Sequence, residues 1–207
     1  MLTLVACAIS IDDVRDIFRA SPSLAERLKA TAAARFAQPS PTKRRWFGPV
    51  LHRDPDERVD AAHPSQHDLD TLLAGSFIQA DRQVPSWQLL IVFLEELAAA
   101  SARVEWDPSL SDQIEFDLAR AGLNSDYALR NLAERDLGIP LRPLPGQLAG
   151  YAKHVQVAET LAALGRVYAR PEVGAAVRAV VDPLIPVLET AAANPHLDLV
   201  VATAPTP

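Results

Sequence analysis

Cysteine is almost absent from this sequence, and long apolar runs and nucleotide-binding motifs are absent altogether. The one cysteine, Cys7, cannot form a disulfide within the chain, which fits a reducing compartment. The longest mostly apolar run, 87–94, ends at two glutamates, whereas a membrane span needs about 20 residues. P-loop, GxGxxG, GxSxG and CxxC patterns are missing. We therefore expect a cytoplasmic protein with no membrane segment and no cofactor.

Basic residues are also fewer than acidic ones. The chain carries 20 basic and 26 acidic residues, for a formal net charge of -6. A nucleic-acid-binding protein needs a basic face to meet the phosphates. The balance of charge therefore argues against nucleic acid as the main partner.

The N-terminal segment resembles a lipoprotein cleavage box at residues 4–7. Only six residues precede Cys7, and Asp12 and Asp13 follow soon after. A signal peptide needs a basic start and an apolar stretch of about 7–15 residues. We therefore expect a buried strand at this place and no secretion.

Regular secondary structure is predicted along most of the chain. Apolar residues at 2–9 and 196–203 predict one strand at each end. Ser23 with Glu26 and Ser65 with Asp68 are expected to cap two helix starts. Pro183 and Pro186 are expected to kink or break the last helix. Helices are predicted at 11–18, 21–37, 65–75, 85–102, 107–122, 124–138, 151–165 and 171–193.

The predicted architecture is a single α+β domain. Two strongly apolar strands at the chain ends are best buried side by side, so we expect a small β-sheet that contains both of them. A mostly helical layer would pack on this sheet. We expect the domain to cover residues 1–204, with a long proline-rich loop at 38–66 and a disordered tail at 205–207.

The order of features is similar to that of a known family. A Trp lies in the loop RRWFGPVLHRDP, and the segments LDTLLAG, SLSDQIEFDLARAGL, LGIPLRPLPGQLAGY and LDLVVAT follow it. This order resembles an uncharacterised family of small actinobacterial proteins and, more distantly, the YfbM-like proteins. The resemblance covers nearly the whole chain and implies an α+β single domain. It implies no catalytic residue, and GPVLHR stands where YfbM-like proteins have further aromatic residues.

Two clusters of side chains are candidates for contact with a protein partner. In the first, Arg44 and Arg45 precede Trp46 and Phe47, whose rings either pin the loop to the core or anchor a partner. The second is an acidic run in which Asp112 and Glu115 share a helical face. They would form a docking face for a basic partner or, as the alternative, an acid–base pair.

Histidine and tyrosine residues are the candidates for chemistry. His63 and His67 are four residues apart, and His52 lies in the same loop, but Pro64 makes a shared helix face unfavourable for a metal. We therefore expect no metal site. Tyr151 and His154 could exchange a proton at a helix start, although a packed ring and a partly exposed imidazole are the simpler interpretation.

The sequence therefore favours a non-catalytic protein-interaction module, of the accessory or immunity type, with a protein partner of unknown identity. The alternative is a small enzyme or small-molecule-binding protein. In that case we expect a pocket between the 38–66 loop and the helical layer, where His63, His67, Tyr151 and His154 would converge.

Overall fold

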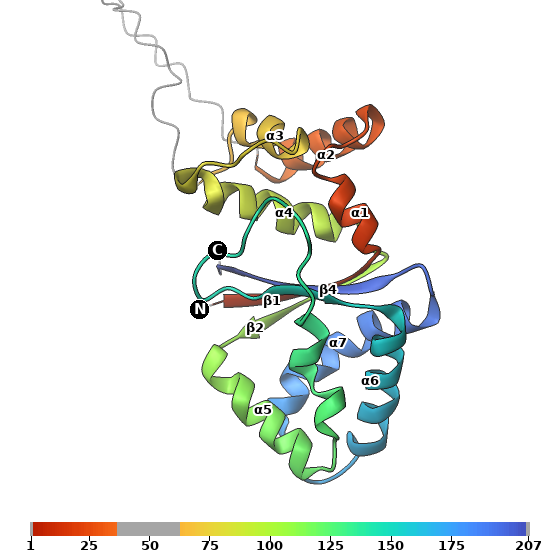
Figure 1. Ribbon diagram of the computed structural model, residues 1–207. Helices are drawn as coiled ribbons and strands as arrows, with labels where there is room; N and C mark the ends of the chain where they lie inside the picture. Colours follow the sequence, from red (N-terminus) through yellow and green to blue (C-terminus); the bar gives the residue numbers. More distant parts are fainter. Residues whose placement is uncertain (1, 37–62, 206–207) are drawn as a thin grey trace, which may run out of the picture.

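A four-stranded antiparallel sheet divides the protein into two helical layers (Figure 1). The computed structural model describes residues 2–36 and 63–205. The strand order is β2-β1-β4-β3, so the two strands nearest the chain ends are neighbours at the centre. The strands are β1 (Leu2–Ile9), β2 (Ala100–Trp106), β3 (Ala149–Ala152) and β4 (Asp198–Pro205).

Helices cover both faces of this sheet. One layer contains α1 (Ile11–Asp16), α2 (Pro22–Arg35), α3 (Gln66–Leu73) and α4 (Gln83–Leu97). Within it, α4 lies against the sheet and α2 and α3 cover the outer side of α4 (Figure 1). The other layer contains α5 (Pro108–Arg120), α6 (His154–Val167) and α7 (Ala175–Ala193). Three 3-10 helices complete the described elements: η2 (Ala80–Arg82), η3 (Ser125–Tyr127) and η4 (Leu129–Ala133).

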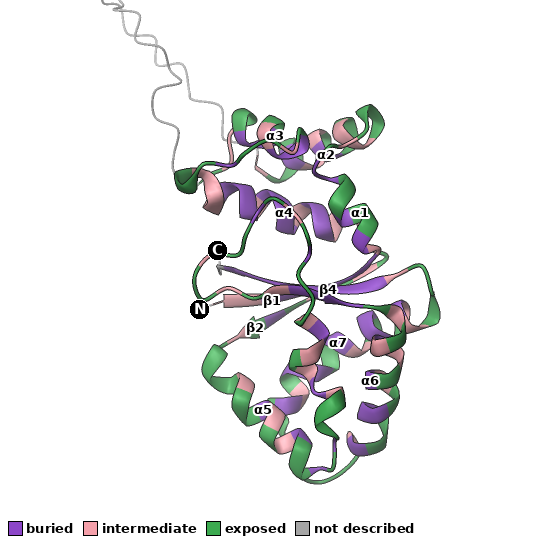
Figure 2. Ribbon diagram, viewed as in Figure 1, coloured by how far each residue is buried: buried purple, intermediate pink, exposed green. Residues whose placement is uncertain are grey.

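The central strand β1 supplies side chains to two separate hydrophobic cores. Val5 and Cys7 pack in the core under α4, whereas Leu4 and Ala6 pack in the core over α7. Successive residues of a strand point to opposite faces, so a strand apolar at every position suits a sheet covered on both sides. Figure 2 shows the buried residues along β1 and β4 and on the helix faces turned toward them.

The predicted α+β class and the sheet containing both terminal strands are confirmed. β1 pairs with β4 over its whole length, from Leu2 opposite Pro205 to Ile9 opposite Asp198. Pro205, which we expected in the tail, therefore belongs to β4. The expectation of one helical layer is wrong, because each face of the central pair is apolar and each requires a cover.

Two of the four strands, β2 and β3, were not predicted from the sequence. The helix predicted at 85–102 ends at Leu97, and β2 begins at Ala100 and pairs with β1. β3 occupies Ala149–Ala152, where a loop and a helix start were predicted. Both are edge strands in the order β2-β1-β4-β3, and pairing with a central strand determines their conformation more than their own composition does.

Three expectations about the helices also need correction. The cap of α2 is Ser21 and not Ser23; the Ser21 hydroxyl accepts from the Leu24 N–H, and Pro22 occupies the first helical position, which proline favours. The segment 124–138 forms two 3-10 helices in place of one α-helix. Pro183 and Pro186 lie inside an uninterrupted α7, which is held against the sheet by its buried residues.

A buried ion pair fixes the start of α3. Ser65 and Asp68 form the predicted capping box, and Arg82 donates to both carboxylate oxygens of Asp68. The Asp68 side chain is 1% exposed. Burial alone would raise the pKa of Asp68, but the hydrogen bonds from Arg82 and Ser65 outweigh burial and lower it.

We expect Asp68→Ala to lower the free energy of unfolding by about 3 kcal/mol, because the change removes the buried carboxylate that accepts hydrogen bonds from the Arg82 guanidinium. Since the folded-state pKa is lowered, the stabilisation is complete above pH of about 4 and is lost as the pH falls through the folded value. Urea unfolding at neutral pH and near pH 3 measures both effects. Asp81→Ala, at an exposed carboxylate, is the control, and an equal loss in both variants would contradict this account.

Candidate functional site

An apolar pocket of about 450 Å³ lies between the sheet and the α5–α7 layer. Its floor is formed by β1 and β4, through Leu4, Ala6 and Val201. Its walls come from α5, from η4, from α7 and from the segment 146–148. Trp106, at the end of β2, closes one corner. The pocket is thus built from elements distributed over the whole chain.

The space exists because α5 is only lightly packed. Of its 13 residues, Ile114 and Leu118 alone are buried. The sheet contributes small side chains below it, such as Ala6, which occupy little of the gap. Leu184 and Leu188 of α7 enter from the side. The resulting walls are mainly aliphatic.

Charged side chains of the pocket lie on α5 and η4. Asp112 and Arg130 are exposed, and Glu115 is half-buried. A carboxylate oxygen of Glu115 accepts from the backbone N–H of Arg130 at 2.8 Å. This bond ties α5 to η4, and Asp112, Glu115 and Arg130 all line the same pocket.

Hydrogen bonds join two other lining residues, Leu148 and Thr203. The Thr203 hydroxyl accepts from the Leu148 N–H at 2.7 Å, and the Thr203 N–H donates to the Leu148 carbonyl at 2.8 Å. From the other helical layer, the Trp87 indole N–H donates to the Thr203 carbonyl at 2.8 Å. The hydroxyl, N–H and C=O groups of Thr203 all have hydrogen-bond partners within the protein. This wall therefore needs no polar group from a ligand.

Comparison with protein-family models, curated proteins and solved structures found no match. The similarity to YfbM-like proteins therefore stays an expectation from the sequence motifs. Among residues 2–36 and 63–205, no helix is long and apolar enough to cross a membrane.

Of the residues singled out in the sequence, Asp112 and Glu115 are at the pocket. The structure confirms that both lie on α5 and adds Arg130 as their neighbour. Their use by a partner stays a prediction. The other expected contact residues, Arg44, Arg45, Trp46 and Phe47, lie outside the described residues, as does His52.

The residues predicted to converge for chemistry are spread over the molecule. Tyr151 packs in the core under α4, with the Arg15 guanidinium 6.0 Å and the Lys153 ammonium 5.5 Å from its ring centre. His154 lies in the other layer, where its Nδ1 is 3.0 Å from the Ala191 carbonyl oxygen. The two side chains are thus on opposite sides of the sheet and cannot exchange a proton directly.

The two earlier histidines are near neither of these residues. The His63 carbonyl accepts from Arg82, and His67 is exposed on α3. In the part of the chain that the structure describes, no three His, Cys, Asp or Glu side chains are grouped as a metal site. These positions therefore do not form a common site.

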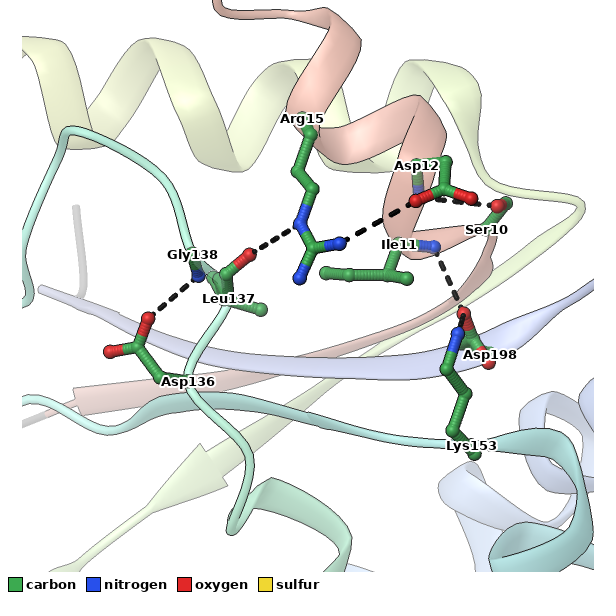
Figure 3. A network of polar contacts seen from close by, with 9 residues as sticks. All are labelled: Ser10, Ile11, Asp12, Arg15, Asp136, Leu137, Gly138, Lys153 and Asp198. Atoms are coloured by element: carbon green, nitrogen blue, oxygen red, sulfur yellow. Dashed lines mark hydrogen bonds and ion pairs between the residues drawn. The ribbon is translucent and has the colours of Figure 1, made fainter.

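A network of polar contacts that includes Arg15 and Lys153, the two cations near the Tyr151 ring, joins four segments (Figure 3). The Asp198 carboxylate accepts from the Ile11 N–H at 3.1 Å and from the Lys153 ammonium at 3.0 Å. Arg15 Nε donates to the Leu137 carbonyl at 3.0 Å. These bonds satisfy the first turn of α1 and anchor the start of β4, so the network is structural.

Sequence reasoning missed the residues that line the pocket. Leu4, Ala6 and Val201 were recognised only as strand residues. An apolar side chain beside a cavity has the same sequence pattern as one in a filled core, so no local signal distinguishes them.

Cys7 is expected to react with iodoacetamide only when the protein unfolds. It is fully buried, and burial together with the negative charge of Glu95 raises the pKa of its thiol to about 12. Because it is the only cysteine, the mass of the intact protein reports its labelling directly. The labelling rate should rise with urea in parallel with unfolding. The control is Cys7→Ser/Ser76→Cys, with an exposed thiol, and equally fast labelling of the native wild type would refute the expectation.

Proposed function

We propose that the protein binds a small, mostly apolar molecule in the pocket between the sheet and α5. The observation that carries the proposal is the volume of about 450 Å³. Ligand pockets typically occupy roughly 300–1,000 Å³ and are lined mainly by apolar side chains. A ligand that covers these apolar walls removes them from water, which is favourable.

The rim supports a more specific description of the ligand. The pocket lining includes two acidic residues, Asp112 and Glu115, and one basic residue, Arg130, so it has a small negative excess. An apolar body with a neutral or cationic end fits this arrangement better than one with an anionic end. Among the described lining residues, these three are the only charged ones. Binding without catalysis is therefore the simplest role.

Contact with a protein partner is the second candidate. The observation in its favour is that α5 exposes two large apolar side chains, Leu110 at 46% and Phe116 at 58%. They flank Asp112 in the sequence of the same helix. An apolar pair beside an acidic residue suits a partner with an apolar and basic surface.

The partner hypothesis predicts that Leu110→Asp/Phe116→Asp removes one specific protein captured from the native extract. Val155→Asp is the matched control, since Val155 is an exposed apolar residue of α6. The captured protein must then bind the purified wild type at a defined ratio and fail to bind the double variant. Loss with both variants would instead indicate nonspecific adhesion.

The ligand hypothesis predicts saturable binding of an uncharged apolar fluorophore such as N-phenyl-1-naphthylamine. We expect Ala133→Trp, which adds bulk to the pocket wall, to weaken this binding at least tenfold. Ala162→Trp adds the same bulk at an exposed position of α6 and should leave it unchanged. Fluorescence titration measures both, after cooperative thermal unfolding has shown each variant to be folded.

Occupancy should also stabilise the fold. A ligand present at 100 times its dissociation constant adds about 2.7 kcal/mol to the free energy of unfolding. The melting temperature of the wild type should therefore rise with fluorophore concentration, and that of Ala133→Trp should not. Absence of saturable binding to the wild type, or equal binding to both tryptophan variants, would defeat the proposal.

A further inference from the structure

Within the described residues, the outer side of β2 is an open edge of the sheet. β2 pairs with β1, and no other described strand pairs with it. The opposite edge is closed, because the Tyr151 N–H of β3 donates to the Arg135 carbonyl in an isolated bridge. An open edge offers a row of backbone groups to another strand, and proteins commonly protect such edges.

The hydrogen-bonding pattern shows which residues of β2 face outward. The Thr203 N–H donates to the Leu148 carbonyl and therefore points away from β1. Leu4 of β1 lies opposite Thr203 in a pair that is not hydrogen-bonded, so the backbone groups of Leu4 point toward β2. Leu4 is opposite Val104, which therefore faces inward. The Ala8 carbonyl, accepting from Ala99, also points toward β2 and agrees with this assignment.

Backbone directions alternate along a strand, so the residues on either side of Val104, Arg103 and Glu105, direct their N–H and C=O groups outward. Both side chains are exposed, and both lie on the sheet face that α4 covers. One is basic and the other acidic. This pair determines which kind of strand the edge can accept.

The edge is complementary to a second copy of itself. If two β2 strands pair in an antiparallel manner about Val104, Arg103 of each copy lies opposite Glu105 of the other. Opposite charges on directly opposed residues stabilise such pairs, and like charges destabilise them. Each Arg103–Glu105 pair would also exchange two backbone hydrogen bonds. The same register satisfies the backbone and the charges together.

The other face of the strand fits the same register. Ala102 would lie opposite Trp106 of the second copy, so a small residue meets a large one on each side of Val104. Both Ala102 and Trp106 are half-buried in the isolated chain and have surface left to cover. Complementary size supports pairing in this register over a shift by one residue, which would reverse the faces.

The helix that follows β2 lies below the sheet (Figure 1). After β2, α5 turns toward η4, to which Glu115 is bonded, and η4 packs on β3 and β4 near the closed edge. Arg103 donates to Glu95 through Nε and Nη2. Among its described contacts Nη1 has no hydrogen bond, which leaves a donor for a carboxylate of the second copy.

We propose that two copies of this chain associate through their β2 edges, antiparallel about Val104, into one continuous sheet. The partner is a second copy because the order Arg103-Val104-Glu105 is complementary to itself in this orientation. The two-fold axis is perpendicular to the sheet, so both apolar pockets open on the same side of the dimer. The proposal stands independently of what those pockets bind.

Charge reversal tests the register. Arg103→Glu places carboxylates opposite carboxylates, and Glu105→Arg places guanidinium groups opposite guanidinium groups, so each variant alone should dimerise at least tenfold more weakly than the wild type. An equimolar mixture of the two variants restores both opposite-charge pairs and should form a heterodimer. Sedimentation velocity over a concentration series measures all of these states. Glu26→Arg, an equal charge change on the exposed surface of α2, should dimerise as the wild type does.

Arg103→Glu also loses the contact with Glu95 and could misfold for that reason. A second variant, which changes the backbone of the edge, tests the proposal in that case. Glu105→Pro removes an outward N–H and no bond to β1, so it should remain folded by circular dichroism and be monomeric. A wild type that stays monomeric at the highest concentration overturns the proposal. So does a wild-type dimer that persists in Glu105→Pro, or a mixture of folded charge variants that does not associate.

Discussion

Burial of the β1–β4 pair on both faces is the constraint from which the rest of the structure follows. Side chains of β1 alternate between two cores, so Cys7 lies under α4 while Ala6 and Ala8 lie over α7. With neither face open to water, the backbone groups of both strands need partners within the sheet. β2 and β3 supply these partners, one on each side. A chain with two strongly apolar end segments therefore needs two further strands, which its sequence shows only weakly.

The elements that could be predicted are those with a strong local signal. β1 and β4 are continuous apolar runs, and Ser65 with Asp68 is a capping box that needs no tertiary context. β2 lacked such a signal for two reasons. The alanine-rich segment 98–102 extends the helical pattern of α4, and Val104 is the only buried residue of β2. Pairing with β1 overrides this local preference. β3 has four residues, too few for alternation to be recognised.

The candidate site was less predictable than the fold for a related reason. The helical spacing of Asp112 and Glu115 placed them on one face, but only the fold brings Arg130 to them and a cavity beneath them. Tyr151 and His154 show the opposite case. They are three residues apart in sequence, yet the end of β3 and the start of α6 fall between them and turn their side chains to different layers. Proximity in sequence is a poor guide wherever a strand passes into a helix.

The segment at η4 connects the pocket with the edges of the sheet. It walls the pocket through Leu132 and Ala133, and it also covers the β3 edge, where the Ala133 carbonyl oxygen would be 1.9 Å from a Cβ at Gly150. Only glycine permits this approach. The pocket wall and the closed edge therefore form together, and a change that moved η4 would open both. The β2 edge is on the side of the sheet away from η4, which packs on β3 and β4. Association through β2 would consequently leave η4 in place. Trp106, which lines the pocket and would lie opposite Ala102 of the second copy, is the residue at which the two surfaces meet.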